Sequence, residues 1–150
     1  MSFRINFTHL LNKKIPTNGR ASLFTLRITK EEYKEYTSLI SKSIDKFNSE
    51  IEWDDMWDLY EAELRLNTNQ ILYLLMDSYK PIGHVWYKSD YLYNAFVSNE
   101  RRDGDSAWFI QKTMWDMKQQ NNIERVNLYV DDWNERAIKF WEKLGYIKLT

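Results

Sequence analysis

The feature that most constrains the fold is a run of three strand-like segments separated by short turns. The segments are Ile71–Met76, Ile82–Lys88 and Tyr91–Val97, and the turns lie at Lys80-Pro81 and Ser89-Asp90. The first segment is almost continuously apolar, and all three are rich in aromatic or aliphatic residues bounded by turn formers. Together they predict an antiparallel meander.

Patterns on either side of the meander extend it into a mixed fold. The other expected elements are a strand at Ser22–Ile28, a helix from an N-cap at Thr29 to about Ile44, a helix at about 53–66, a helix at about 106–120, a strand at Arg125–Val130, a helix at about 134–144 and a short strand at 146–149. The order β-α-α-β-β-β-α-β-α-β predicts an α/β (α+β) fold with a mixed, mostly antiparallel sheet flanked by helices. Because a helix connects strands 91–97 and 125–130, these two should be parallel. Residues 1–20 form an N-terminal extension in which only a turn at Asn18-Gly19 is recognisable.

Composition limits the classes of protein that fit. With 150 residues, 43% of them apolar, we expect one domain, 1–150, with a sizeable core. The net charge of −1 argues against nucleic-acid binding, and no apolar run approaches the ~20 residues of a membrane span. Cysteine is absent, and His9 and His84 have no carboxylate at ligand spacing, so no metal site is expected. A cytoplasmic protein is predicted.

A polar loop after the meander carries the first functional signal. It combines cationic and small residues just where a helix begins: Arg101, Arg102, Gly104, Ser106 and Ala107. A helix N-terminus leaves about four N–H groups without partners and carries about half a positive charge, so such a loop can hold a diphosphate. Asp103 and Asp105 lie in the same loop, and we expect both to point outward into water. The alternative is an ordinary charged loop.

The C-terminal third adds a more specific pattern. After a strand it shows Asn-x-x-Ala at a helix start, an aromatic pair, a charged pair and Leu-Gly-aromatic, which are Asn134, Ala137, Phe140, Trp141, Glu142, Lys143, Leu144, Gly145 and Tyr146. This segment resembles the closing segment of the GNAT superfamily of N-acetyltransferases. Residues 101–106 resemble that family's [Arg/Gln]-x-x-Gly-x-[Gly/Ala] loop, and 81–88 and 94–97 resemble its third and fourth strands. An ungapped alignment would instead place the motif on Arg102, Asp105 and Ala107.

The resemblance implies an N-acetyltransferase that moves an acetyl group from acetyl-CoA, its co-substrate, to a primary amine. It places the pantetheine arm between the fourth and fifth strands of the family's sheet. The cofactor-binding residues implied in this way are Phe96, Val97, Ser98, Arg101, Arg102, Asp103, Gly104, Asp105, Ser106, Ala107, Asn134 and Trp141. The N–H of Phe96 or Val97 would polarise the thioester carbonyl, as an oxyanion donor does.

The residues for proton transfer are less determined. Many family members place a tyrosine general acid in the last helix, where this chain has Trp141, and an indole cannot give up a proton near neutral pH. Tyr91 and Tyr93 alternate along one strand, and we predict that they order a water chain that removes the proton of the amine. His84 is the other candidate base, although a lone histidine on a strand is more often structural.

The acceptor is expected to be a small cationic amine, such as a polyamine, an aminoglycoside or a basic peptide end. Between residues 45 and 63 the chain has a single lysine and many acids: Asp45, Glu50, Glu52, Asp54, Asp55, Asp58, Glu61 and Glu63. An acidic wall attracts a cationic substrate, and the alternative is a solvated helix face. Trp53 and Trp57 would stack on the substrate or belong to the core.

Two other function classes stay open. A non-catalytic acyl-CoA-binding or interaction domain on the same fold is the main alternative, and a nucleic-acid or protein-interaction module is the third. After the short strand at 146–149 the family's last strand has no counterpart. A partner chain or the N-terminal segment would complete the sheet, so a homodimer is a further prediction.

Overall fold

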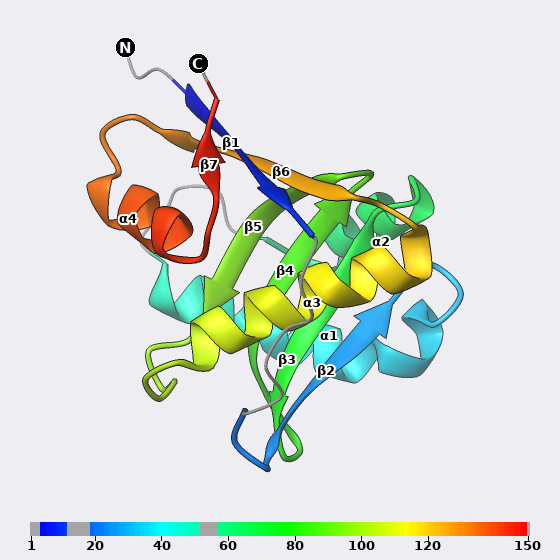
Figure 1. The fold of residues 1–150 in the computed structure, drawn as a ribbon. Helices are drawn as coiled ribbons and strands as arrows, with labels where there is room; N and C mark the ends of the chain where they lie inside the picture. The colour runs from blue at the N-terminus through cyan, green and yellow to red at the C-terminus, as the bar shows by residue number, and fades with distance from the viewer. Residues whose placement is uncertain (1–3, 12–18, 52–56, 150) are drawn as a thin grey trace.

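The structure, a computed structural model, describes residues 4–11, 19–51 and 57–149 (Figure 1). Its elements are β1 (Arg4–Leu10), β2 (Leu23–Ile28), α1 (Tyr33–Glu50), α2 (Leu59–Asn67), β3 (Ile71–Asp77), β4 (Lys80–Lys88), β5 (Tyr91–Val97), α3 (Asp105–Asn121), β6 (Arg125–Asp131), α4 (Glu135–Lys143) and β7 (Ile147–Lys148). The strands form one sheet in the order β2-β3-β4-β5-β6-β1-β7. Neighbouring strands are antiparallel except β5 and β6, which are parallel. The mixed, mostly antiparallel fold and the parallel crossover predicted from the sequence are both confirmed.

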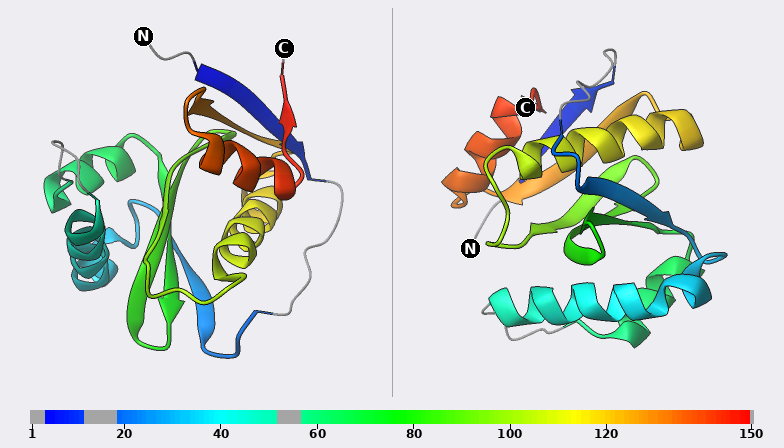
Figure 2. Two further views of the ribbon diagram at one scale, coloured as in Figure 1. Left: turned by 90° about the vertical axis from the view of Figure 1, so that its left-hand side faces the viewer. Right: turned by 90° about the horizontal axis from the view of Figure 1, so that it is seen from below.

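The helices cover both faces of the sheet: α1 and α2 lie on one face, and α3 and α4 on the other (Figure 2). β3 shows how the two layers share one sheet. Its side chains at Leu72, Leu74 and Met76 belong to the core beneath α1 and α2, whereas Tyr73 and Leu75 belong to the core on the α3 face. The nearly continuous apolar sequence of this strand follows from its burial on both faces.

The first helix begins later and ends later than expected. Thr29 and Glu32 do interact, because the backbone N–H of Thr29 donates to the Glu32 carboxylate at 3.0 Å. The residues between them form turns, however, and α1 itself runs from Tyr33 to Glu50. The longer C-terminal end matters for the site described below, because Glu50 is the last residue of the helix.

The second helix begins at Leu59 rather than at Trp53, which lies with 52–56 outside the described residues. Asp58 is its N-cap, accepting a hydrogen bond from the N–H of Glu61 at 2.8 Å. The side chain of Asn48 binds the backbone of Trp57 through both its amide nitrogen (2.7 Å) and its oxygen (3.1 Å). These bonds hold Trp57 outside the helix.

The N-terminal segment, for which the sequence predicts only a turn, contains a strand. β1 lies between β6 and β7, pairing with β6 along its whole length and with β7 at Phe7 and Thr8. Ile5 and Phe7 alternate with Asn6 and Thr8, as in other strands, and Phe7 is fully buried. The N-terminal segment therefore completes this part of the sheet, and the homodimer stays a prediction. Among the described residues, no helix is long and apolar enough to cross a membrane.

Candidate functional site

A gap between the two parallel strands is the central feature of the candidate site. β5 and β6 are paired at Tyr91 and Asn127 alone, where the N–H of Asn127 also donates to the carbonyl of Asp90 at 2.7 Å. Beyond this joint the strands separate toward their carboxyl ends, near which α3 and α4 begin (Figure 1). Ligands of open α/β sheets bind at such carboxyl ends. The edge of β5 that faces β6 thus has backbone groups without a strand partner.

A bulge bends β5 beside this gap. The pairing of β4 with β5 shifts between His84, which is opposite Phe96, and Trp86, which is opposite Tyr93. Asn94 accommodates the extra residue with a φ of 51°. Such bulges increase the local twist and redirect side chains, often next to functional sites. Phe96 and Val97, the residues predicted to contact the thioester, follow directly after the bulge.

The loop after β5 presents unused backbone donors at the start of α3. Gly104 is the N-cap of this helix, with a φ of 88°, and a Cβ built there meets no atom within 4 Å. Within the described part of the chain, no acceptor is found for the N–H groups of Asp103, Gly104, Ser106 or Ala107. A helix N-terminus with free N–H groups and open space beside it is suited to an anion. Of the six backbone amides from Arg102 to Ala107, which the resemblance places against the diphosphate, four are therefore available.

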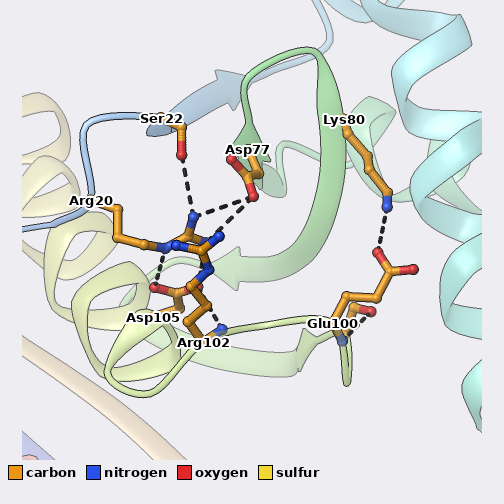
Figure 3. Close-up of polar contacts among 8 residues, drawn as sticks. Arg20, Ser22, Asp77, Lys80, Glu100, Arg102 and Asp105 are labelled. Carbon is orange, nitrogen blue, oxygen red and sulfur yellow. Dashed lines mark hydrogen bonds and ion pairs between the residues drawn. The ribbon is translucent and has the colours of Figure 1, made fainter.

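The prediction for Asp105 is wrong, whereas Asp103 is exposed as expected. Asp105 is 3% exposed and accepts hydrogen bonds from Arg20 Nε (3.2 Å), Arg20 Nη2 (2.7 Å) and the N–H of Arg102 (2.9 Å) (Figure 3). Burial alone would raise the pKa of this carboxyl, but the bonds from Arg20 and Arg102 outweigh burial and lower the pKa. The error arose because Arg20 lies in the N-terminal segment, far from the loop in sequence.

The backbone between β5 and α3 is fixed by carboxylates and lysines. Glu50, at the end of α1, accepts from the Ser98 hydroxyl at 2.6 Å and from the N–H of Asn99 at 2.7 Å. Glu100 forms ion pairs with Lys46 at 2.8 Å and Lys80 at 2.6 Å, and hydrogen bonds from these lysines lower its pKa to about 2. The loop is therefore anchored to α1 and to the first residue of β4 before α3 begins.

Two of the predicted cofactor-binding residues, Ser98 and Arg101, already form hydrogen bonds with other backbone groups of the protein. The N–H of Ser98 donates to the carbonyl of Ile82 at 2.8 Å, which leaves it unavailable to a ligand in this arrangement. The exposed Arg101 turns its guanidinium back onto the carbonyls of Val97 (3.3 Å) and Ser98 (3.1 Å). Arg102 is also exposed, with its side chain beside the Arg20–Asp105 pair in Figure 3.

At the second helix that begins near the gap, Asn134 acts as the N-cap of α4. Its side-chain oxygen accepts from the N–H of Ala137 at 3.2 Å, so the amide nitrogen keeps its two donors for another partner. Trp133, next to it, is 67% exposed. Trp141 lies instead in the core, 8% exposed, with its ring 4.9 Å from Phe140 and 5.3 Å from Tyr146.

The predicted catalytic tyrosines have different surroundings. The Tyr93 hydroxyl accepts from Arg65 Nη1 at 2.9 Å, and burial raises its pKa despite this cation. Tyr91 is 43% exposed and lies at the joint of β5 and β6. His84 is buried with its Nε2 3.2 Å from Asn94 Oδ1, and burial lowers its pKa to about 4. Tyr93 is thus a poor base near neutral pH, and His84 is part of the core on the α1 face.

The acidic segment is partly used inside the protein. Glu50 anchors the loop, Asp58 caps α2, and Glu61 pairs with Arg65 at 3.0 Å. Asp45 and Glu63 are exposed, while Glu52, Asp54 and Asp55 lie outside the described residues. Trp57 packs beside Trp86 at 5.8 Å, and the Arg65 guanidinium lies 4.3 Å from its ring centre. One face of this tryptophan already contacts a cation of the same chain.

Comparison with known proteins identifies the fold. Among solved structures, the chain is similar to a Drosophila protein (TM-score 0.69, 10% identity, 97% of this chain and 47% of that one). It is also similar to a GCN5-related N-acetyltransferase from Sphaerobacter thermophilus (TM-score 0.66, 11% identity, 97% and 48%). A third similar structure is an aminoglycoside acetyltransferase from an uncultured soil metagenomic sample (TM-score 0.60, 18% identity, 83% and 88%).

The chain spans about half the length of the first two of these proteins and most of the third. No protein-family model matches the chain, and no curated protein sequence does. The protein therefore has the GNAT fold, shown at low sequence identity by structural similarity. In the resemblance described above, β5 and β6 correspond to the fourth and fifth strands of the family's sheet, and the gap lies between them.

Proposed function

We propose that this protein is an N-acetyltransferase that moves an acetyl group from acetyl-CoA to a primary amine. The observation that carries the proposal is the combination of a gap between β5 and β6 with four free N–H groups at the start of α3. A pantetheine arm in the gap would pair with the open edge of β5, and the diphosphate would lie on the amides around Gly104. The fold shared with known acetyltransferases supports the same assignment.

In this mechanism acetyl-CoA supplies an activated acetyl group, and the chain supplies position and hydrogen bonds. A backbone N–H of Phe96 or Val97 donates to the thioester oxygen, which becomes more negative as the amine attacks. A bond forms between the amine nitrogen and the acetyl carbon, the carbon–sulfur bond breaks, and CoA leaves as a thiolate. The amine proton passes to water ordered near Tyr91 and Tyr93; the Tyr93 hydroxyl accepts a hydrogen bond from Arg65 and keeps its own O–H to donate to such a water.

The acceptor that we propose is a small cationic amine. Asp45 and Glu63 are exposed, and neither forms an ion pair with another described residue, whereas Glu61 pairs with Arg65. The soil acetyltransferase of similar fold acts on aminoglycosides by its name, and one of its structures contains sisomicin. Aminoglycosides and polyamines are therefore the first acceptors to assay.

A non-catalytic acyl-CoA-binding domain is the second candidate. Trp141 occupies the position of the family's general acid and packs in the core against Tyr146. Solvent can protonate a leaving thiolate, whose pKa is about 8.5 for an ordinary thiol, so this substitution does not prevent turnover. A thiol-release assay with a panel of amines distinguishes the two candidates.

The test of the cofactor site uses calorimetry with acetyl-CoA and two variants of Gly104. Any side chain there is strained by the φ of 88°, so Gly104→Glu and Gly104→Gln share the backbone penalty and differ only in charge. We expect the unmodified protein to bind, the glutamine variant to bind more weakly, and the glutamate variant to bind at least about tenfold more weakly than the glutamine variant. Absence of binding by the unmodified protein would overturn the proposal.

A further inference from the structure

We propose that Arg20 is a positioning residue for the diphosphate-binding loop, because it neutralises the one buried carboxylate at the start of α3. This inference rests on the proposed function and assigns a role in acetyl-CoA binding to the N-terminal segment. Neither the family's loop pattern nor the resemblance assigns any role to this segment.

The geometry of the Arg20–Asp105 contact is that of a forked ion pair. Nη2 and Nε of Arg20 lie 2.7 and 3.2 Å from the two different oxygens of Asp105 (Figure 3). Such two-bond pairs between guanidinium and carboxylate fix direction as well as charge. Oδ2 of Asp105 also accepts the N–H of Arg102 at 2.9 Å. Arg20 therefore orients a side chain that in turn holds the backbone of the loop.

Arg20 has a second carboxylate neighbour, Asp77 at the end of β3. Nη1 and Nη2 lie 3.4 Å from the same Asp77 oxygen, and Nη1 is also 3.3 Å from the Ser22 hydroxyl. The Asp77 side chain is 33% exposed, against 4% for that of Asp105. Water screens the first charge much more than the second. The cation thus acts mainly on Asp105 and uses Asp77 as an anchor.

The charge of Asp105 would otherwise oppose the proposed ligand. Asp105 is the first residue of α3, so its carboxylate competes with a diphosphate for the positive end of the helix. A bare buried carboxylate would repel an anion at the adjacent amides of Gly104 and Ser106. With Arg20 in place, the Arg20–Asp105 pair has little net charge and repels an anion at these amides much less. The hydrogen bond from the N–H of Arg102 to Asp105 still fixes the backbone of the loop.

Gly19 gives independent evidence that the segment carrying Arg20 is fitted to α3. A Cβ built on Gly19 would lie 2.5 Å from the indole of Trp108, in the first turns of the helix. Only a residue without a side chain allows the backbone this close to the indole. Gly19, the residue before Arg20, is therefore packed directly against the helix whose N-terminus forms the candidate site.

The test compares two acyl donors, acetyl-CoA and S-acetyl-pantetheine, which lacks the diphosphate. We expect Arg20→Ala to raise the KM for acetyl-CoA about tenfold or more and to leave that for S-acetyl-pantetheine nearly unchanged. Arg20→Lys keeps the charge without the fork and should retain part of the affinity. The double variant Arg20→Ala/Asp105→Asn removes both charges, and its KM for acetyl-CoA should return to within about threefold of the original.

A purely structural role for Arg20 predicts different results. It would raise the KM for both donors equally, and the double variant would be no better than Arg20→Ala; either outcome overturns the inference. Circular dichroism establishes whether each variant is folded, and if Arg20→Ala is not, Arg20→Lys and the double variant decide between the same outcomes. If the unmodified protein fails to use or bind acetyl-CoA, the proposed function fails, and the inference fails with it.

Discussion

The two halves of the sheet are assembled in opposite ways. β2, β3, β4 and β5 follow one another in the chain with α1 and α2 inserted once, and each strand pairs with the next one. In the other half, β6 pairs with β1 from the N-terminal end of the chain, and β1 pairs with β7 from the C-terminal end. One half is thus local in sequence, and the other joins the most distant segments of the molecule.

This difference explains how a gap can persist inside a sheet. β6 pairs with β1 from Arg4 opposite Asp131 to Leu10 opposite Arg125, so its backbone is satisfied on one side without β5. β5 is likewise held by β4 on its other side. The two halves need only the joint at Tyr91 and Asn127, and the open edges beyond it are free for a ligand. Such an edge pairs readily with an extended chain, as pantetheine is.

The largest effect is expected from weakening the distant half at β1. Phe7 is fully buried, and Phe7→Ala should lower the free energy of unfolding by about 3–5 kcal/mol. Denaturant titration measures this loss, with Leu10→Ala as the control on the same strand, because Leu10 is 43% exposed. Equal losses in the two variants would contradict the assignment of Phe7 to the core that holds this half together.

A second prediction concerns the local half and its buried histidine. Because the pKa of His84 is lowered from 6.5 to about 4 by burial, the unfolded chain binds a proton that the folded chain does not. The stability that depends on neutral His84 is complete above pH 6.5 and is lost as the pH falls toward 4. A difference of 1.36 kcal/mol for each pKa unit makes the full loss about 3 kcal/mol.

Replacement of each histidine in turn measures this contribution. His84→Gln should flatten the decrease in unfolding free energy between pH 7 and pH 5, a range that lies above the usual pKa values of carboxyl groups. His9→Gln is the matched control, because it makes the same replacement in the other half of the sheet. There, on β1, His9 Nε2 lies 3.1 Å from the Leu144 carbonyl oxygen. The same flattening in both variants would contradict the assignment to His84.

The same difference between the two halves explains how much of the fold can be predicted from the sequence. The meander was predictable because its turns are short and its strands have clear apolar patterns, and the parallel joint followed from the crossover through α3. β1 has an alternating pattern of its own, but its partners lie more than a hundred residues away, as Phe7 opposite Leu128 shows. An alternating pattern shows that a segment favours a strand, but it does not show which distant strand will pair with it.

The candidate site shows the same limit. Gly104 and the loop were recognised because backbone approach to phosphate requires small residues at known spacing. The sequence does not predict the roles of Arg20, Glu50 and Arg65, because each acts on the site through a contact that only the folded chain creates. The acidic pattern around Glu50 was visible, but it predicted a substrate wall and not an anchor for Ser98.

A smaller effect is expected at the boundary of the gap, at Gly83 of β4. A Cβ there would be 2.7 Å from the carbonyl oxygen of Phe96, so Gly83→Ala must push β5 away from β4. We expect a loss of about 1–3 kcal/mol in unfolding free energy, as for other overpacked sites. Because β5 would move toward the gap, acetyl-CoA affinity measured by calorimetry should also fall.

Gly104→Ala is the informative comparison for this last prediction. It introduces a residue at a φ of 88° but meets no atom within 4 Å, so its cost is backbone strain alone, about 1 kcal/mol. Gly83 allows β4 and β5 to lie close together, whereas Gly104 allows the loop backbone to adopt a positive φ. If Gly83→Ala lowers the free energy of unfolding without changing acetyl-CoA affinity, the position of β5 does not control the gap. The separate support of the two halves of the sheet would then have no role in ligand binding.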